Sequence, residues 1–290
     1  MRCSFSKKGT NMKNEIHVLK NTVNHRQMQS IIITTEGGKV IAIDGGRREN
    51  ADYMIEYLKE ITGQAIPVVD AWFLTHAHND HLPAFYEIVQ NRSSEVVIGT
   101  VFYNLPSIQY YTRIPEEVDE DGAITTKTFF EILPLIADRV CVASGGDVYE
   151  IGDAKFEILY SAETDIKVNV CNNASLVFKM TLGGKTVMFT GDCGVEAGLK
   201  ILERYGDSGI LKCDICQMAH HGQEGCSREF YEAVSPTECL WCTPDWLWNN
   251  DRGNGFNTHF YKTVEVRGWM EEIGVKKNYV TMNGTQVCRL

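Results

Sequence analysis

The stretch WFLTHAHNDHLPAF, residues 72–85, places four candidate metal ligands directly after an apolar run. Three of the eight histidines and one aspartate fall within six positions, namely His76, His78, Asp80 and His81. Histidine is the commonest metal ligand among side chains, and a neighbouring carboxylate indicates a divalent cation. Side chains at i and i+2 of an extended backbone point to the same side, so His76 and His78 can bind one cation, and Asp80 and His81 can face a second. We therefore predict a metal site at the end of a buried strand.

The composition is typical of a globular protein. The chain has 290 residues, of which 43% are apolar and 23% charged. No window approaches the roughly 18 apolar residues of a spanning helix, and the basic N-terminus lacks the apolar segment of a secretory signal. We therefore expect a cytoplasmic protein with no membrane partner and with reduced thiols. The net charge of −10 disfavours long nucleic acid as a partner. The oligomeric state stays open.

Short apolar runs and helical periodicities alternate along the chain. We predict strands or hairpins in residues 30–46, 68–75, 95–100, 147–161, 175–192, 212–222 and 238–243. A small hairpin is expected to close the chain at residues 276–290. Helices are predicted around residues 51–61, 126–136, 195–205, 227–234 and 262–273. The acidic run at residues 116–121 is interpreted as a solvated loop.

The same order of elements occurs in both halves of the chain. Strands are followed by a helix in each half, and no low-complexity linker separates the halves. This order favours two stacked β/α halves within a single domain at residues 15–290, which is an α/β protein. Residues 1–14 are expected to be a disordered N-terminus, and Met12 is an alternative start.

The pattern His-x-His-x-Asp-His, with a threonine before it, resembles the signature of the metallo-β-lactamase superfamily. The family's further motifs follow in order as IDGG with Asp44, FTGD with Asp192, and AHHG with His220 and His221. The resemblance implies a four-layer αβ/βα sandwich. It also implies that Asp44 supports the metal-ligand loop, that Asp192 bridges two metal ions, and that one of the two adjacent histidines is the terminal ligand of the second ion.

A closer resemblance is to the metallo-β-lactamase-like domain of DNA-internalisation competence proteins and their free-standing relatives. NNASLVFKM, GGKTVMFTGD and AHHG are similar to that branch's motifs, and so is the tail at residues 254–287. The resemblance runs from about residue 15 to the C-terminus. His259 matches a histidine that is common in that tail, which makes it a candidate for contacting substrate.

The chain departs from the family at the first metal. Many members have a third histidine there, but this chain has none between His81 and His220. The first ion would then be held by His76, His78, Asp192 and solvent, with Asn173 as a further oxygen donor. Such an oxygen-rich site leaves Mn²⁺ open beside Zn²⁺ as the cofactor.

The resemblance implies a metal-dependent hydrolase in which two divalent ions share a bridging hydroxide. Asp192 would bridge the ions, and Asp80 would orient the hydroxide. A phosphodiester in a small molecule or short oligonucleotide is the preferred substrate. The alternatives are hydrolysis of a carboxylic ester, lactone or lactam at the same site, and a non-catalytic metal-binding module. The full set of metal ligands expected is His76, His78, Asp80, His81, Asp192, His220 and His221.

Two further groups of residues have competing interpretations. Two Cys-x-x-Cys pairs could form a zinc ribbon, but each lies in a strand pattern, where residues i and i+3 point to opposite faces. We therefore expect Cys213, Cys216, Cys239 and Cys242 to pack as small core residues. The aromatic residues of a polar loop could stack on a base, enclose a cationic group or cover the domain's edge; these are Trp246, Trp248, Phe256 and Phe260.

Overall fold

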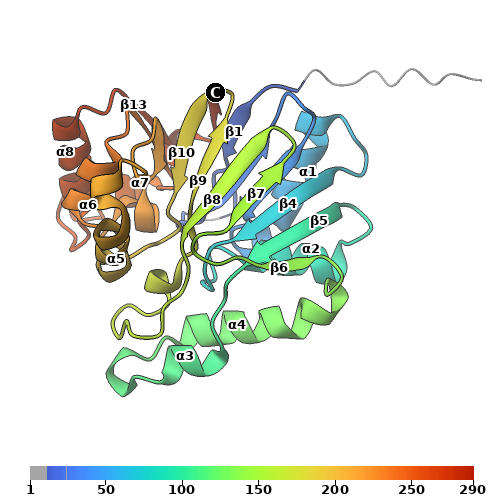
Figure 1. The fold of residues 1–290 in the computed structure, drawn as a ribbon, viewed down its shortest axis with the longest axis horizontal. Helices are drawn as coiled ribbons and strands as arrows, with labels where there is room; N and C mark the ends of the chain where they lie inside the picture. Colours follow the sequence, from blue (N-terminus) through green and yellow to red (C-terminus); the bar gives the residue numbers. More distant parts are fainter. Residues whose placement is uncertain (1–11, 24) are drawn as a thin grey trace, which may run out of the picture.

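Two seven-stranded sheets stacked face to face form the centre of the computed structural model, which describes residues 12–23 and 25–290 (Figure 1). Residues 1–11, the greater part of the predicted disordered segment, lie outside the described residues. Asn14 is buried, and its side-chain oxygen accepts a hydrogen bond from the backbone N–H of Glu36 at 2.8 Å.

The first sheet is built from the N-terminal half and the last strand of the chain. Its order is β14 (Gln286–Arg289), β1 (Glu15–Val18), β2 (Ser30–Thr34), β3 (Val40–Asp44), β4 (Val68–Leu74), β5 (Val97–Tyr103) and β6 (Val140–Val142). The pairs from β14 to β3 are antiparallel, and those from β3 to β6 are parallel. Several loops therefore leave this sheet at the carboxyl ends of parallel strands.

The second sheet repeats this arrangement with the rest of the chain. Its order is β13 (Lys277–Val280), β12 (Glu238–Trp241), β11 (Ile215–Gln217), β10 (Lys185–Phe189), β9 (Val177–Leu182), β8 (Ala154–Tyr160) and β7 (Val148–Ile151). Its parallel part runs from β13 to β10, and its antiparallel part from β10 to β7. The prediction of two stacked β/α halves matches this pair of sheets.

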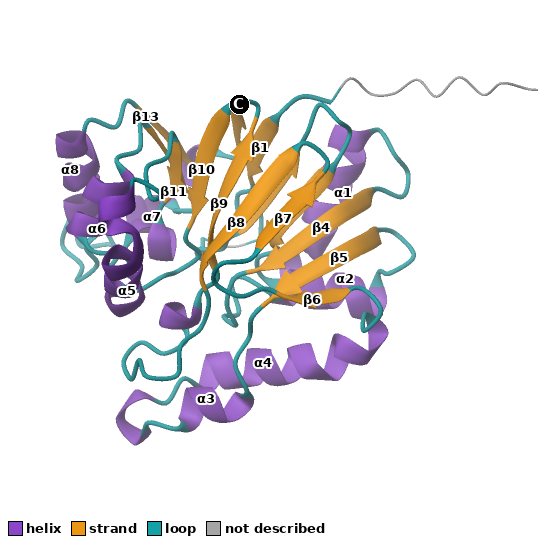
Figure 2. Cartoon of the chain, viewed as in Figure 1, coloured by secondary structure: helices purple, strands orange, loops and turns teal. Residues whose placement is uncertain are grey.

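Helices cover the outer face of each sheet, as Figure 2 shows. The first sheet carries α1 (Ala51–Thr62), α2 (Pro83–Asn91) and α4 (Glu120–Ile132), and α3 (Ile108–Thr112) packs against α4. The second carries α5 (Val195–Tyr205), α6 (Arg228–Val234), α7 (Asp245–Trp248) and α8 (Thr263–Ile273). The order helix, sheet, sheet, helix is the four-layer αβ/βα sandwich that the resemblance implied.

The largely aliphatic core between the sheets contains a cluster of aromatic rings. Phe73 of β4 stacks on Phe102, Phe156 and Phe178, with ring centroids 4.6, 4.7 and 4.8 Å away. Large aromatic side chains bury 150–250 Å² each and dominate core energetics. The cluster holds β4 in place three residues before His76, so the core directly supports the predicted metal-ligand loop.

Two expectations about local structure were wrong. The C-terminal residues 276–290 do not form a hairpin, because β13 pairs with β12 in one sheet and β14 pairs with β1 in the other. A short turn at Thr281–Asn283 and the left-handed Gly284, with φ 100°, carry the chain between the sheets. The helix predicted at residues 126–136 is α4, which begins at Glu120, within the acidic run.

None of the described helices is both long and apolar enough to cross a lipid bilayer.

Candidate metal centre

Three loops from the two sheets meet at one end of the sandwich. The loop after β4 carries His76 and its neighbours, and the loop after β10 carries Asp192. The 3₁₀ turn η6 (Ala219–Gly222), which follows β11, carries His220 and His221. The backbone N–H of His220 donates to the carbonyl of Gly191 at 3.2 Å, which ties the last two loops together. Ligand sites in open α/β sheets typically form at the carboxyl ends of such strands.

Asp192 lies at the centre of the predicted ligands. Its carboxylate oxygens are 3.8 Å from His76 Nε2, 3.2 Å from His81 Nε2 and 3.4 Å from His221 Nε2. One of these oxygens, Oδ1, is buried and has no hydrogen-bond partner among the described residues. His76, His81 and Asp192 form one group whose ligand atoms lie within 4.8 Å of one another. A carboxylate placed among three imidazole rings has the position that a bridging ligand requires.

A second group contains Asp80, His81 and His221, again with ligand atoms within 4.8 Å of one another. Asp80 Oδ2 lies 3.4 Å from His221 Nε2, and the Nε2 atoms of His81 and His221 are 3.4 Å apart. The guanidinium of Arg47 is 3.6 Å from Asp80 and orients this carboxylate from the outer side. The structure therefore brings His221, and not His220, to the second group.

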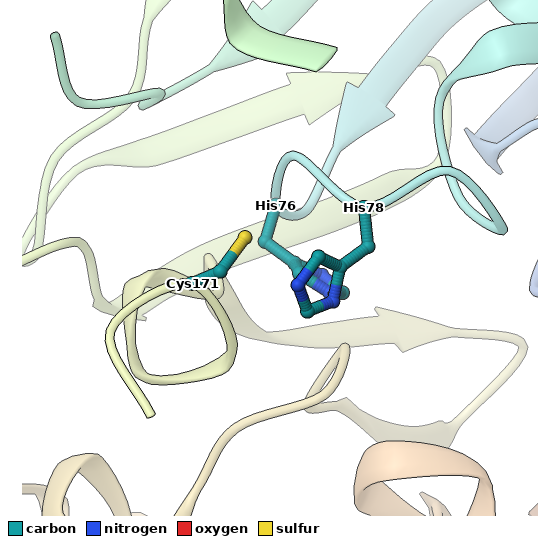
Figure 3. Close-up of side chains that lie close together, drawn as sticks. All are labelled: His76, His78 and Cys171. Carbon is teal, nitrogen blue, oxygen red and sulfur yellow. The ribbon is translucent and has the colours of Figure 1, made fainter. Parts of the chain in front are cut away.

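The third group contains His76, His78 and Cys171 (Figure 3). His76 Nε2 and His78 Nδ1 are 3.1 Å apart. The close-up shows the thiol of Cys171 pointing from a short helical turn towards the two rings. The sequence prediction did not include this cysteine.

Each of the four histidines in these groups hydrogen-bonds through the ring nitrogen that faces away from the centre. His81 Nδ1–H donates to Asp44 at 2.7 Å, and His221 Nδ1–H donates to the carbonyl of Cys242 at 3.0 Å. His78 Nε2–H donates to Asp119 at 3.0 Å, and the Nδ1 of His76 lies 3.1 Å from the hydroxyl of Thr75. Such outer partners fix the tautomer and leave the inward nitrogen free to bind a metal. The donor set and its orientation therefore fit divalent cations.

Asp44 is the main support of the loop after β4. Its carboxylate accepts hydrogen bonds from the backbone N–H and the hydroxyl of Thr75 at 2.8 and 2.7 Å, and from Gln29 at 3.0 Å. Together with the bond from His81, these contacts use both oxygens of a fully buried carboxylate. This is the supporting position that the resemblance implied for Asp44.

Backbone strain also occurs at this site, where three of the seven described non-glycine residues with positive φ lie. Asp44, His220 and His221 have φ values of 55°, 52° and 55°, in the left-handed region that residues with a Cβ rarely adopt. Each such residue costs about 1–3 kcal/mol and persists only where surrounding contacts hold it. Gln217 supplies some of these contacts, because its buried amide bonds the backbone of Thr190, Gly191 and Met218.

Burial and close charges shift the pKa values in this cluster. Burial lowers the pKa of His81, but the carboxylates of Asp192 and Asp44 outweigh it and raise the pKa to about 10. Burial also lowers the pKa of His221, but the carboxylates of Asp192 and Asp80 outweigh this effect and raise the pKa to about 9. Burial alone would raise the pKa of Asp192, yet the neighbouring histidines hold it well below the ordinary value. A metal ion must therefore displace protons from these rings.

The other candidate residues lie around this centre. Asn173 Oδ1 accepts from the backbone N–H of Ala197 at 3.0 Å, and its Nδ2 donates to Val168 and Glu196, so its side chain anchors α5. His259 stacks on Tyr261 with a centroid distance of 4.7 Å and belongs to none of the ligand groups found among the described residues. Its predicted contact with substrate stays a prediction.

The cysteines of both Cys-x-x-Cys pairs are free and buried in apolar clusters. None of them joins a metal-ligating group within residues 12–23 and 25–290. Trp248 packs against the core of the second sheet, whereas Phe256 and Phe260 are exposed.

Sequence reasoning missed Asp119 and Cys171. The acidic run was interpreted as a solvated loop, but Asp119 caps α4 through the N–H of Gly122 and bonds His78. Asp121 in turn bonds the backbone and side chain of Asn79. An acidic residue just before a helical periodicity is an N-cap signal, and it could have placed the helix start correctly.

Comparisons with known proteins agree with this geometry. The metallo-β-lactamase superfamily model matches residues 24–102, which contain the His-x-His-x-Asp-His motif. The chain is 26% identical over 182 residues to the ComE operon protein 3 of Bacillus subtilis (strain 168), a match that covers 62% of this chain and 20% of that protein. The matched region thus spans about a fifth of that relative's length.

Solved structures share the fold. The metallo-β-lactamase fold protein YhfI from Bacillus subtilis superposes with a TM-score of 0.53 at 12% identity, covering 96% of this chain and 100% of that one. CmlA, a diiron β-hydroxylase from Streptomyces venezuelae, superposes with a TM-score of 0.55 at 12% identity over 97% of this chain and 55% of that one. The matched motif, the fold and the buried His/Asp groups make this chain similar to the metal-dependent hydrolases of the metallo-β-lactamase superfamily.

Proposed function

We propose that this hydrolase cleaves a phosphodiester bond in a small molecule or at the end of a short oligonucleotide. The observation that carries the proposal is the position of Asp192, whose carboxylate lies within 3.8 Å of histidines from two ligand groups. When bound there, paired divalent cations such as Zn²⁺ stabilise charge on both the attacking and the leaving oxygen of a phosphoryl group and lower the pKa of water towards neutrality.

Two carboxylates have distinct tasks in this proposal. Asp192 holds the two halves of the site at a fixed separation, because its oxygens face His76, His81 and His221. Asp80 is buried at the edge of the second group and is oriented by Arg47. It can accept a hydrogen bond from the attacking water and so aim that water at the substrate.

A pocket of about 450 Å³ adjoins the metal centre through His220. Its volume lies in the range of small-ligand sites. His220 donates its Nδ1–H to the carbonyl of Glu224, so its Nε2, 3.4 Å from the amide of Asn172, can accept a hydrogen bond. Burial lowers the pKa of His220 and keeps the ring neutral at pH 7. We assign it to substrate binding.

The charge of this pocket limits the size of the substrate. Glu117, Glu196 and Glu224 line it, together with the aromatic rings of Phe260 and Tyr261. Long nucleic acids are bound through many lysine and arginine contacts to phosphate, and their affinity falls steeply with salt. An acidic wall and a net charge of −10 instead favour one nucleotide-sized group stacked on the rings.

The test is a set of three substrates on one preparation. Protein reconstituted with Zn²⁺ or Mn²⁺ is assayed with bis(p-nitrophenyl) phosphate, a lactone and a β-lactam. We expect phosphodiester turnover that a chelator removes, that Asp192→Asn abolishes, and that Asp214→Asn, a carboxylate change away from the site, leaves intact. Turnover of the lactone or lactam alone would replace the proposal with the ester or lactam alternative. Metal binding without any turnover would indicate a binding module.

The size limit has its own test. Long single-stranded DNA should bind weakly at physiological salt. Tight binding that weakens steeply with added salt would contradict the proposed substrate class.

A further inference from the structure

A cysteine, Cys171, lies beside His76 and His78 at the first metal position, where many family members have a third histidine. No histidine occurs between His81 and His220, so the chain cannot supply a third imidazole from that region. We propose that the thiolate of Cys171 is the third protein ligand of the ion that His76 and His78 bind. The inference rests on the proposed metal site and adds a ligand to it.

The distances suit a tetrahedral ion. Zinc lies about 2.0–2.1 Å from histidine nitrogen and about 2.3 Å from cysteine sulfur, which places two nitrogens about 3.3 Å apart and nitrogen and sulfur about 3.6 Å apart. His76 Nε2 and His78 Nδ1 are already 3.1 Å apart. The three donor atoms, Cys171 Sγ included, lie within 4.8 Å of one another. A movement of about 1 Å, well within the reach of a thiol rotamer, completes the geometry.

Cys171 is held firmly in this position. It is fully buried and caps the 3₁₀ turn η4 (Asn172–Ala174), where its carbonyl accepts from the N–H of Ala174 at 3.0 Å. The thiol also packs against α4 at Gly122. A Cβ at position 122 would come within 3.1 Å of the sulfur and 2.7 Å of the Tyr111 ring. Glycine therefore permits the close packing that presents the sulfur to the two rings.

Asp119 connects the thiol to His78. Its Oδ1 caps α4 through the N–H of Gly122 at 2.7 Å, and its Oδ2 accepts from His78 Nε2–H at 3.0 Å. The first turn of α4 therefore does two things. Asp119 orients His78 so that its Nδ1 faces inward, and Gly122 packs against the sulfur of Cys171. Of the described cysteines, Cys171 is the one that joins a group of metal-ligating atoms. Other cysteines, such as Cys193 and Cys216, lie in the apolar core of the second sheet.

The chemistry of binding is simple. Cys171 releases its thiol proton to solvent, and the sulfur lone pair forms the bond to the cation. The negative sulfur partly neutralises the ion and makes the donor set softer than two imidazoles with oxygen ligands. Soft thiolate ligands select zinc, whereas oxygen-rich sites suit manganese. The inference therefore assigns Zn²⁺ to the first position and removes the need for an oxygen from Asn173.

Cobalt spectroscopy tests this assignment. A thiolate bound to Co²⁺ gives an intense charge-transfer band in the near ultraviolet, which imidazole and carboxylate ligands do not give. We expect this band in the wild-type protein loaded with Co²⁺ and in Cys193→Ser, a change of a buried cysteine beside Asp192. Cys171→Ser should lose the band and bind Zn²⁺ at the first site more than tenfold less tightly, since losing even an outer-shell partner costs about tenfold.

A second measurement is independent of any variant. X-ray absorption at the zinc edge of the wild-type protein should show sulfur at about 2.3 Å among the nitrogen and oxygen neighbours. Cobalt or zinc bound without a sulfur neighbour would overturn the role of Cys171 and leave the proposed hydrolase standing. A band that persists undiminished in Cys171→Ser would also overturn it. If neither metal binds at all, the proposed function fails together with this inference.

Discussion

Replacement of Asp44 by asparagine probes the support of the metal site without touching a ligand. The carboxylate of Asp44 only accepts hydrogen bonds, and it receives them from Thr75, Gln29 and His81. Asparagine keeps the shape but replaces one acceptor oxygen with an NH₂ donor. This NH₂ group must then face another hydrogen-bond donor. The most damaging case is His81 Nδ1–H, because the ring relieves the clash by moving its proton to Nε2, the nitrogen that should bind the metal.

The expected magnitude follows from this geometry. His81 Nε2 faces Asp192 at 3.2 Å, and a proton on this nitrogen would prevent it from binding a metal ion. His81 belongs to two of the ligand groups, so both groups would lose a ligand atom. Loss of an outer partner of this kind typically lowers metal affinity 10–100-fold, or about 1.4–2.7 kcal/mol. We expect Asp44→Asn to lower zinc affinity by that factor, measured by competition with a chromophoric chelator, while circular dichroism shows the fold retained.

Asp214 offers a matched control. Its carboxylate also accepts the backbone N–H and the hydroxyl of one threonine, Thr186, both at 2.8 Å, but it contacts no histidine. Asp214→Asn should leave zinc affinity unchanged. Equal zinc affinity in Asp44→Asn and wild type would refute the reasoning, because it would show that the Asp44–His81 contact does not orient a ligand.

Three other predictions concern the core, the pH dependence and the start of α4. Phe73→Ala should lower the free energy of unfolding by about 3–5 kcal/mol in denaturant titrations, whereas Phe260→Ala, at an exposed site, should change it by less than about 0.5 kcal/mol. The metal-free protein should lose the stability contributed by protonated His81 and His221 as the pH rises through about 9 to 10, since their folded pKa values are raised above the ordinary 6.5. Zinc binding should accordingly release protons at pH 7, and calorimetry in buffers of different ionisation enthalpy checks this; a buffer-independent heat would contradict it. Asp119→Asn should weaken zinc binding about 10–100-fold through His78, and unchanged affinity would show that the acidic run only faces solvent.

Local signals in the sequence were enough for the centre of the fold. The hairpin of β2 and β3 follows from two β-rich runs around Gly37 and Gly38, and both strands form as predicted. The largely apolar run of β4 predicted a buried strand, and the clustered histidines directly after it predicted a metal site at its end. These features depend on residues close together in the chain, where spacing alone determines which side chains share a face.

Features that depend on distant residues were not predictable in this way. Residues 277–280 and 286–289 both have strand character, and only the positions of β12 and β1 decide that they join different sheets. Asp119 contacts His78 across 41 residues, and its acidic neighbours indicated solvent. Cys171 lies more than 90 residues from His76 and His78, and no spacing rule connects them. Its closeness to the two histidines became visible only when η4 and the loop after β4 were placed side by side.

The metal content of the purified protein tests the central claim most directly. After reconstitution with Zn²⁺ and removal of free ions, elemental analysis should find up to two ions per wild-type chain. Asp192→Ala should lose most of this metal, because its carboxylate faces histidines of both groups, whereas Cys213→Ser should retain it, because that thiol packs in the apolar core. A wild-type protein that holds no zinc or manganese after reconstitution would contradict the account.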